Sequence, residues 1–140
     1  LNLGQSATLN ASAENASDVT FAWSNSATLT AATQNVAPYV SSTYYVTGTN
    51  ACNNVKSNEV TISVVWPTAI NPYNQDGLND IFVAGFNIVV FDRFGHQIFS
   101  GNNGWNGKID SDYAQPGVYY YVVTLPNNDV KKGTVEVVKP

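Results

Sequence analysis

Short runs of alternating apolar and polar residues, separated by Asn, Ser, Gly and Pro, constrain this chain more than any other feature. A period of two places every second side chain on one face of a β-strand. The runs that we interpret as strands are residues 6–12, 19–24, 27–31, 42–50, 58–65, 87–92, 96–100, 117–125 and 130–138. No segment has convincing helical periodicity. The sequence therefore predicts an all-β fold of two tandem small β-sandwich domains.

The boundary between the two domains is predicted at the segment Val65-Trp66-Pro67-Thr68. Pro67 has no N–H to donate to a strand ladder, and eight of the ten glycines follow it. Such a rise in glycine marks a change to a fold with tighter turns. We therefore predict one domain over residues 1–65 and a second over residues 67–140.

Two of the predicted strands carry expectations about burial. The strand 58–65 should turn three alternating residues toward an inner face, namely Val60, Ile62 and Val64. In the strand 87–92 both faces are apolar, through the consecutive residues Ile88, Val89, Val90 and Phe91. Apolar side chains on both faces are typical of a strand that is buried on two sides.

Composition excludes several classes of function. A net charge of −4 and a pI near 4.6 disfavour nonspecific nucleic-acid binding. No apolar run approaches the roughly 18 residues of a transmembrane helix, so the chain is not expected to span a membrane. Because Cys52 is the only cysteine, no intrachain disulfide can form. We interpret the start at Leu1, without Met or signal peptide, as a fragment boundary.

Catalytic machinery is not recognisable in the sequence, and we predict that the chain is not an enzyme. It has no Gly-X-Ser-X-Gly elbow, no paired-His metal motif and no phosphate-binding Walker loop. Asp110 and Asp112 are the residue types of a glycosidase pair. They flank Ser111 in a polar loop, however, where a solvated turn is the favoured interpretation.

Five short motifs follow one another at wide spacing in the second half. They are NQDGLND at 74–80, FDRFG at 91–95, GWNG at 104–107, PGVYYYVV at 116–123 and KGTVEVV at 132–138. Each motif alone is a weak signal, but five in this order are specific. The candidate partner-binding residues within them are Asn74, Asp76, Gly77, Asn79, Asp80, Arg93, Gly95, Trp105, Gly107, Gly117, Tyr119, Tyr121, Lys132 and Gly133.

In this order the motifs resemble the C-terminal sorting domain of proteins exported by the bacterial type IX secretion system, in its type B or gliding-motility variant. The resemblance runs from about Pro67 to Lys139. It departs from the family pattern in the first turn, which is one residue longer and has Gln75 in place of a Gly, and at Phe94, where Trp is frequent.

That resemblance implies a partner and a location for the chain. The partners would be the type IX translocon and a PorP/SprF-like barrel protein of the outer membrane. The chain would be exported across that membrane to the cell surface or the medium. Its upstream passenger would be a gliding adhesin or a secreted hydrolase, and the sorting domain itself would act by binding without chemistry.

The first half resembles bacterial immunoglobulin-like or PKD-like repeats. Trp23 and Tyr44 carry this resemblance. In such sandwiches a buried Trp packs between the sheets, and a Tyr closes a corner of the fold through its hydroxyl. The resemblance implies that residues 1–65 form a spacer or stalk domain.

The first motif has two interpretations. Asp76-Gly77 is a turn dipeptide, and an Asx turn is the favoured interpretation because Asp bonds back to the backbone and Gly accepts positive φ. The alternative is a calcium loop, with Asn74, Asp76, the Leu78 carbonyl and Asp80 at alternate positions as at the start of an EF-hand loop. Gly85 stands where the twelfth-position acid is expected. We therefore predict no cofactor, with calcium as the alternative.

The remaining motifs also have a structural and a functional interpretation. Arg93 is expected to bond Asp92 or the turn carbonyls near Gly95, or alternatively to clamp a carboxylate of a partner. Trp105 is expected to fill the core. Alternatively it stacks on sugars with an exposed Tyr, which would make the chain a carbohydrate- or surface-binding module. Docking by β-augmentation is expected at an edge strand, either the 130s strand or the Tyr-rich strand.

Overall fold

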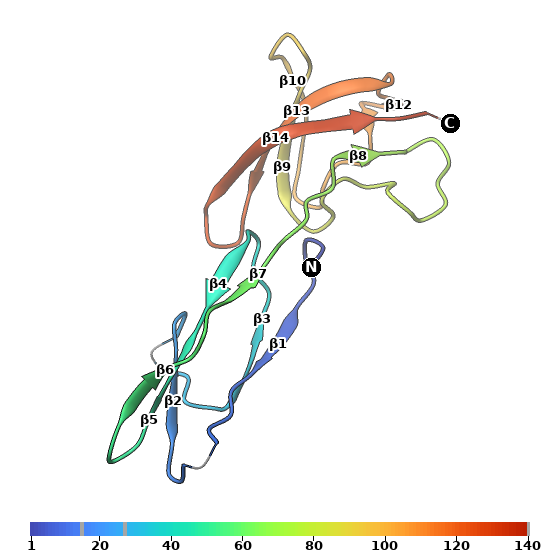
Figure 1. Cartoon of the computed structure of the whole chain (residues 1–140). Helices are drawn as coiled ribbons and strands as arrows, with labels where there is room; N and C mark the ends of the chain where they lie inside the picture. The colour runs from blue at the N-terminus through green and yellow to red at the C-terminus, as the bar shows by residue number, and fades with distance from the viewer. Residues whose placement is uncertain (15, 27, 140) are drawn as a thin grey trace. The chain divides into compact units, whose positions relative to one another are not determined.

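The computed structural model describes residues 1–14, 16–26 and 28–139, and every regular element within these ranges is a β-strand. The prediction of an all-β fold is confirmed. The chain divides into two compact units, Leu1–Val65 and Trp66–Pro140. Figure 1 labels most of the strands of both units along the chain, and each unit is described by itself below.

Seven short strands in three small sheets build the first unit. They are β1 (Ala7–Asn10), β2 (Thr20–Trp23), β3 (Thr33–Val36), β4 (Ser42–Tyr44), β5 (Val46–Thr49), β6 (Asn54–Lys56) and β7 (Val60–Ile62). All pairings between them are antiparallel: β1 with β3, β2 with β5, β5 with β6, and β4 with β7. The Ser57 amide donates to the Val46 carbonyl at 2.7 Å, and the Val46 amide donates to Ser57 Oγ at 3.0 Å. These bonds join the β5–β6 and β4–β7 pairs into one long hairpin.

Two predicted strands of this unit differ from the structure. The run 42–50 is interrupted at Tyr45, where the hairpin changes register between β4 and β5. The strand predicted at 27–31 is wrong for residues 28–31, which form no strand, and Ala27 lies outside the described residues. The partner of β1 is β3 instead, because Gln34 and Val36 alternate inward there and bury against the core.

The core of the first unit lies between β1–β3 and the long hairpin with β2. Its buried residues are Trp23, Gln34, Val36, Tyr44 and Val46. The indole N–H of Trp23 donates to the Ala31 carbonyl at 2.8 Å, so the buried donor is satisfied. The inner face predicted for β7 is only partly correct. Ile62 and Val64 are half-buried, but Val60 is 50% exposed because it borders an open side of the unit.

A five-stranded sheet with the order β10-β9-β13-β14-β8 dominates the second unit. Its strands are β8 (Ala69–Ile70), β9 (Asn87–Phe91), β10 (Gln97–Gly101), β13 (Gly117–Thr124) and β14 (Val130–Val137). Only β8 is parallel to its neighbour, β14. A separate short hairpin consists of β11 (Lys108–Ile109) and β12 (Asp112–Tyr113).

One face of this sheet is buried and the other is not. On β13 the inward residues are Tyr119, Tyr121 and Val123, of which Tyr121 and Val123 are fully packed. On β9, Ile88 and Val90 are buried, whereas Val89 and Phe91 are only half-buried. The predicted burial of β9 on two sides therefore holds for one side.

Irregular chain covers the buried face. Phe82 and Trp105 form an isolated antiparallel bridge, in which each amide donates to the other residue's carbonyl, at 2.8 and 3.0 Å. The Phe82 ring lies 4.9 Å from the Tyr121 ring, and the Trp105 ring lies 5.3 Å from the Tyr119 ring. This bridge thus acts as a second layer over the sheet.

Candidate docking surface

The first motif forms a self-contained turn. The Leu78 amide donates to Asp76 Oδ1 at 2.8 Å, which is the Asx turn expected from the sequence. The Gly77 amide donates to Asp80 Oδ2 at 2.8 Å, and Gly77 has a φ of 84°. The Asn79 carbonyl accepts from the Asn71 amide at 2.9 Å and closes the loop. The motif therefore fixes a backbone shape.

The same bonds occupy the residues of the alternative calcium loop. The side-chain amide of Asn74 donates to Asp76 Oδ2 at 2.8 Å, so these two side chains bond each other. Within the described residues no group of three or more His, Cys, Asp or Glu side chains is placed to hold a metal ion. The geometry of Asn74, Asp76 and Asp80 is that of a hydrogen-bonded turn.

The second motif is the tight turn between β9 and β10. Asp92 Oδ1 accepts from the amides of Phe94 at 2.8 Å and His96 at 2.9 Å, and its Oδ2 lies 3.1 Å from His96 Nδ1. Desolvation raises the pKa of Asp92, but these hydrogen bonds together outweigh it and lower the pKa below its ordinary value. Gly95 takes a φ of 85° in this turn.

Arg93 and Phe94 project from the tip of that turn. Phe94 is 71% exposed, and the Arg93 guanidinium lies 5.0 Å from the centre of its ring, a cation–π contact. Among the described residues no carboxylate lies within salt-bridge distance of Arg93. The expected bond from Arg93 to Asp92 is therefore wrong, because the turn amides and His96 already occupy that carboxylate.

Trp105 is fully buried, as its core interpretation predicted. Its indole N–H donates to the Lys108 carbonyl at 2.9 Å. A Cβ at Gly104 would lie 2.4 Å from the Phe82 carbonyl oxygen, and one at Gly107 would lie 2.5 Å from Pro72 Cγ. The glycines let the backbone close around the indole, and the sugar-stacking alternative for Trp105 is wrong because no face of its ring is open.

The fourth and fifth motifs meet on adjacent strands. Tyr121 is opposite Gly133, and a Cβ there would lie 2.7 Å from the Tyr121 hydroxyl oxygen. The Tyr121 ring therefore lies over Gly133, and burial raises the pKa of the Tyr121 hydroxyl. The Tyr119 hydroxyl donates to the Gln115 carbonyl at 2.8 Å. Both tyrosines are committed to the fold, so the exposed tyrosine of the run is Tyr120.

Gly117 and Lys132 have simpler positions. Gly117 begins β13 with a φ of 149°, at the point where the chain enters the sheet. Lys132 is exposed on β14, where it pairs with Val122. Of the candidate residues, only Arg93 and Lys132 thus present a long cationic side chain at the surface of the sheet unit.

Apolar residues gather instead on the open face of the sheet. We call this set the outer stripe, and its members are Val89 and Phe91 on β9 and Val118, Tyr120 and Val122 on β13. Phe91 is paired with Tyr120, and Val89 with Val122, so the two rows are neighbours. Two shallow depressions adjoin them, one bordered by Lys132 and Thr134 and the other by Asn87 and Ser100.

The strand order decides which edges are open to a partner. β13 lies between β9 and β14, so β-augmentation on the Tyr-rich strand is excluded. β10 is one edge of the sheet. At the other edge β8 covers only Glu136 and Val137 of β14, so within the described residues the earlier part of β14 has no strand neighbour on that side. The 130s strand is therefore an edge strand over most of its length.

Three segments that carry or adjoin the motifs lie at one end of the sheet. Phe91 pairs with Tyr120, Gly117 pairs with Val137, and Val137 pairs with Ile70. The turn after β9, the start of β13 and the loop after β8 therefore leave the sheet at the same end.

A family model for the CHU_C type IX secretion signal domain matches residues 64–137, more than half of the chain.

The chain belongs to this type IX secretion signal family. No curated protein matches the chain. Membership makes the second unit a C-terminal sorting signal that interacts with the secretion machinery, and it places the exported protein at the cell surface or outside the cell. In the described ranges, the structure contains no helix of the length and hydropathy needed to cross a membrane.

Sequence reasoning missed the outer stripe of this secretion signal domain. The signal was present, since β9 is apolar on both faces and Tyr120 alternates with its neighbours. The motif glycines and Trp105 are unusual residues, but they shape turns and strand ends or pack in the core. The ordinary valines beside Tyr120 form the exposed face.

Proposed function

We propose that the second unit docks on a PorP/SprF-like barrel protein of the outer membrane through the outer stripe. It acts by binding without catalysis. The observation that carries this proposal is an apolar sheet face on which Tyr120 is 50% exposed and Val118 is 53% exposed. Exposed apolar patches of this kind mark interaction sites, and Tyr is enriched in protein interfaces.

Polar and charged side chains border the outer stripe. Lys132 and Thr134 flank it on β14, and Gln97 and Ser100 flank it on β10. An apolar centre with a polar rim is the usual anatomy of a protein interface. The Arg93–Phe94 pair at the tip of the β9–β10 turn adds a second exposed contact, of residue types that are enriched at protein interfaces.

The rest of the proposal concerns the cargo. The first unit serves as an immunoglobulin-like spacer, and the exported protein is a surface adhesin of a gliding bacterium. The buried Trp23 and Tyr44 of the first unit support the spacer role. If residues 66–140 are deleted from the exported protein, we expect the cargo to be lost from the cell surface and retained inside the cell.

An export assay tests the stripe directly. The 140-residue chain is fused behind a fluorescent reporter in a bacterium with a type IX system, and Val118, Tyr120 and Val122 are replaced together by Thr. Threonine keeps a high strand propensity while it removes apolar surface. We expect at least a tenfold loss of secreted reporter and of the co-purified barrel protein, with an unchanged melting temperature.

Leu78→Thr is the matched control. Leu78 is 69% exposed in the first motif and lies outside the outer stripe. If the triple Thr variant is exported normally and Leu78→Thr is not exported, recognition belongs to the loop of the first motif, and the proposal for the outer stripe is refuted. If instead the wild type binds glycans, and the triple variant is exported normally but no longer binds them, a carbohydrate-binding role is favoured.

A further inference from the structure

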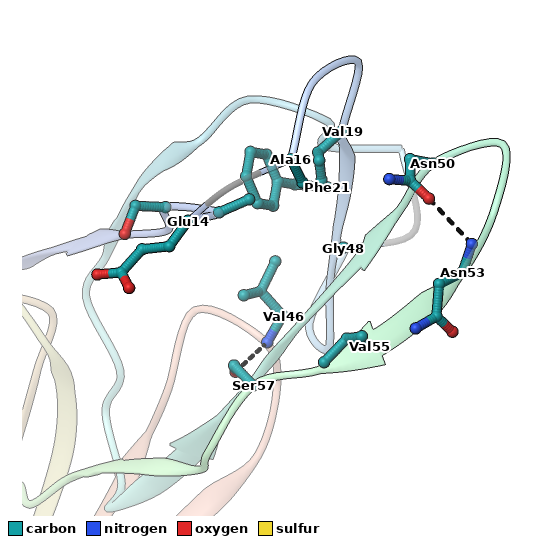
Figure 2. A pocket seen from close by; sticks show the side chains of 12 residues that line it. Glu14, Ala16, Val19, Phe21, Val46, Gly48, Asn50, Asn53, Val55 and Ser57 are labelled. Carbon is teal, nitrogen blue, oxygen red and sulfur yellow. Dashed lines mark hydrogen bonds between the residues drawn. The ribbon is translucent and has the colours of Figure 1, made fainter.

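The first unit is open along one side. Two adjoining hollows of ≈ 360 and ≈ 330 Å³ lie there, and Ser12, Val46 and Ser57 line both. Figure 2 shows the larger hollow, with Phe21 on β2 and Val46 on the neighbouring strand β5 among the residues that line it. We call the two hollows together the side groove.

Strand edges without a neighbour border the side groove on both sides. In the described part of the chain β1 pairs only with β3, β6 only with β5, and β7 only with β4. Residues 9–12 line the groove on one side and residues 57, 58 and 60 on the other. Val55 is 59% exposed and Val60 is 50% exposed along it.

Such a site fits an extended strand better than a compact ligand. Its polar rim is already used: Asn50 Oδ1 accepts from the amides of Cys52 and Asn53, and Ser57 Oγ accepts from the Val46 amide. An added strand bonds to open backbone edges and places alternate side chains in successive pockets. Two adjoining hollows between open edges match that requirement.

The first residues of the chain show which strand this is. Asn2 is bridged in parallel to Val65. The Leu3 amide donates to the Val65 carbonyl at 3.0 Å, and the Val65 amide donates to the Leu1 carbonyl at 2.8 Å. The ladder then continues to the amino group of Leu1, which donates to the Ser63 carbonyl at 2.8 Å. A parallel strand extended backward from Leu1 would run along β7 toward Val60 and Ser57.

We propose that the side groove is filled by the polypeptide that leads into Leu1 in the exported protein, as a strand parallel to β7. The proposal rests on the secretion function only because a sorting signal is joined to its cargo. At about 3.3 Å per residue, roughly six residues suffice to run from Ser63 to Ser57.

The existing ladder also fixes the phase of that strand. Leu1 and Leu3 are half-buried, and Asn2 is exposed. Because side chains alternate along a strand, the second, fourth and sixth residues before Leu1 share the inward face. Apolar residues belong at these positions. The cargo is then attached through a strand of the spacer rather than through a flexible tether.

Designed extensions of the 140-residue chain test this. One variant carries eight residues before Leu1 that alternate Thr and Val, with Val at the second, fourth and sixth positions before Leu1. The control has the same composition shifted by one residue, which turns every Val to solvent. The in-phase extension should raise the melting temperature of the first unit by at least about 5 °C. It should also slow amide exchange at Thr61 and Ser63 at least tenfold, and the shifted control should do neither.

Three outcomes overturn the proposal. Equal stabilisation by both extensions would show that the groove does not select the phase of the strand. No stabilisation by either would show that the groove takes no parallel strand. Full stabilisation of the unextended chain by the free in-phase octapeptide at micromolar concentration would assign the groove to a separate partner. Export of the reporter is measured alongside and does not depend on the extension, so failure here is distinct from failure of the sorting proposal.

Discussion

Replacement of Gly104 by Ala tests whether the GWNG motif exists for close backbone contact. Gly104 has a φ of 75°, and a Cβ there would lie 2.4 Å from the Phe82 carbonyl oxygen and 2.9 Å from the Ala84 nitrogen. Both contacted atoms belong to the backbone of the segment that bridges Trp105. Neither can rotate away as a side chain does, so the bridge itself must move.

Two terms set the size of the effect. A left-handed conformation costs a residue with a Cβ about 1–2 kcal/mol, and overpacking in a dense core costs about 1–3 kcal/mol more. The matched control is Gly95→Ala, since Gly95 has a φ of 85° but no atom within 4 Å of the position that a Cβ would take. We therefore expect a loss of about 1–2 kcal/mol at Gly95 and about 2–5 kcal/mol at Gly104.

The assay is hydrogen exchange of the 140-residue chain, read at Val123 and Val135. Both residues are fully buried in the second unit, so their exchange reports its global opening rather than that of the first unit. At about 4–8 °C per kcal/mol, calorimetry should also separate the two variants by several degrees. Equal losses in both variants would show that Gly104 is required only for its φ, and the close-contact argument would fail.

Three further substitutions have defined outcomes. Trp105→Ala should destabilise the second unit by about 3–5 kcal/mol in denaturant titrations, because it empties a fully buried site; a loss below about 1 kcal/mol would contradict that burial. Because folding lowers the pKa of Asp92, its carboxylate stabilises the fold at pH values above the pKa that it has in the unfolded chain. This contribution is lost as the pH falls through the pKa of the folded state. The melting temperatures of wild type and Asp92→Asn should therefore converge below about pH 4, and a constant difference would refute the linkage. Asp76→Ala removes the bond from the Leu78 amide and should cost about 0.5–1.5 kcal/mol. Exchange at that amide should then quicken while the core is unaffected.

Alternation predicted most strands because it is a local property. β1, β2, β9, β10, β13 and β14 lie within two residues of their predicted bounds. The failures have two causes, pairing with a distant strand and very short length. β3 carries the polar run Thr33–Val36, and its burial depends on pairing with β1 far away in sequence. β8, β11 and β12 are two residues long, and no pattern of period two can be detected over that length.

Site residues were harder to assign for a different reason. Motif spacing indicated the family but not which way each side chain points. Tyr120 and Tyr121 differ only in phase, yet one is exposed and the other lies over Gly133 in the core. The phase follows from the register with β9 and β14, which the sequence of one strand does not contain.

Most of the motif residues of the secretion signal domain shape its backbone and core, and other residues form its exposed surface. Gly104, Gly107 and Gly133 each lack a side chain, so that a backbone segment, the Pro72 ring and the Tyr121 ring, respectively, can pack closely against them. The Asp76 and Asp92 carboxylates bond amides of their own turns. Motif residues of this kind specify a shape and leave little side-chain chemistry for a partner. Under the proposed docking, recognition then falls to surfaces that the shape presents, of which the outer stripe is apolar. Docking through the outer stripe should accordingly depend only weakly on salt, since screening acts on charges and leaves apolar burial intact.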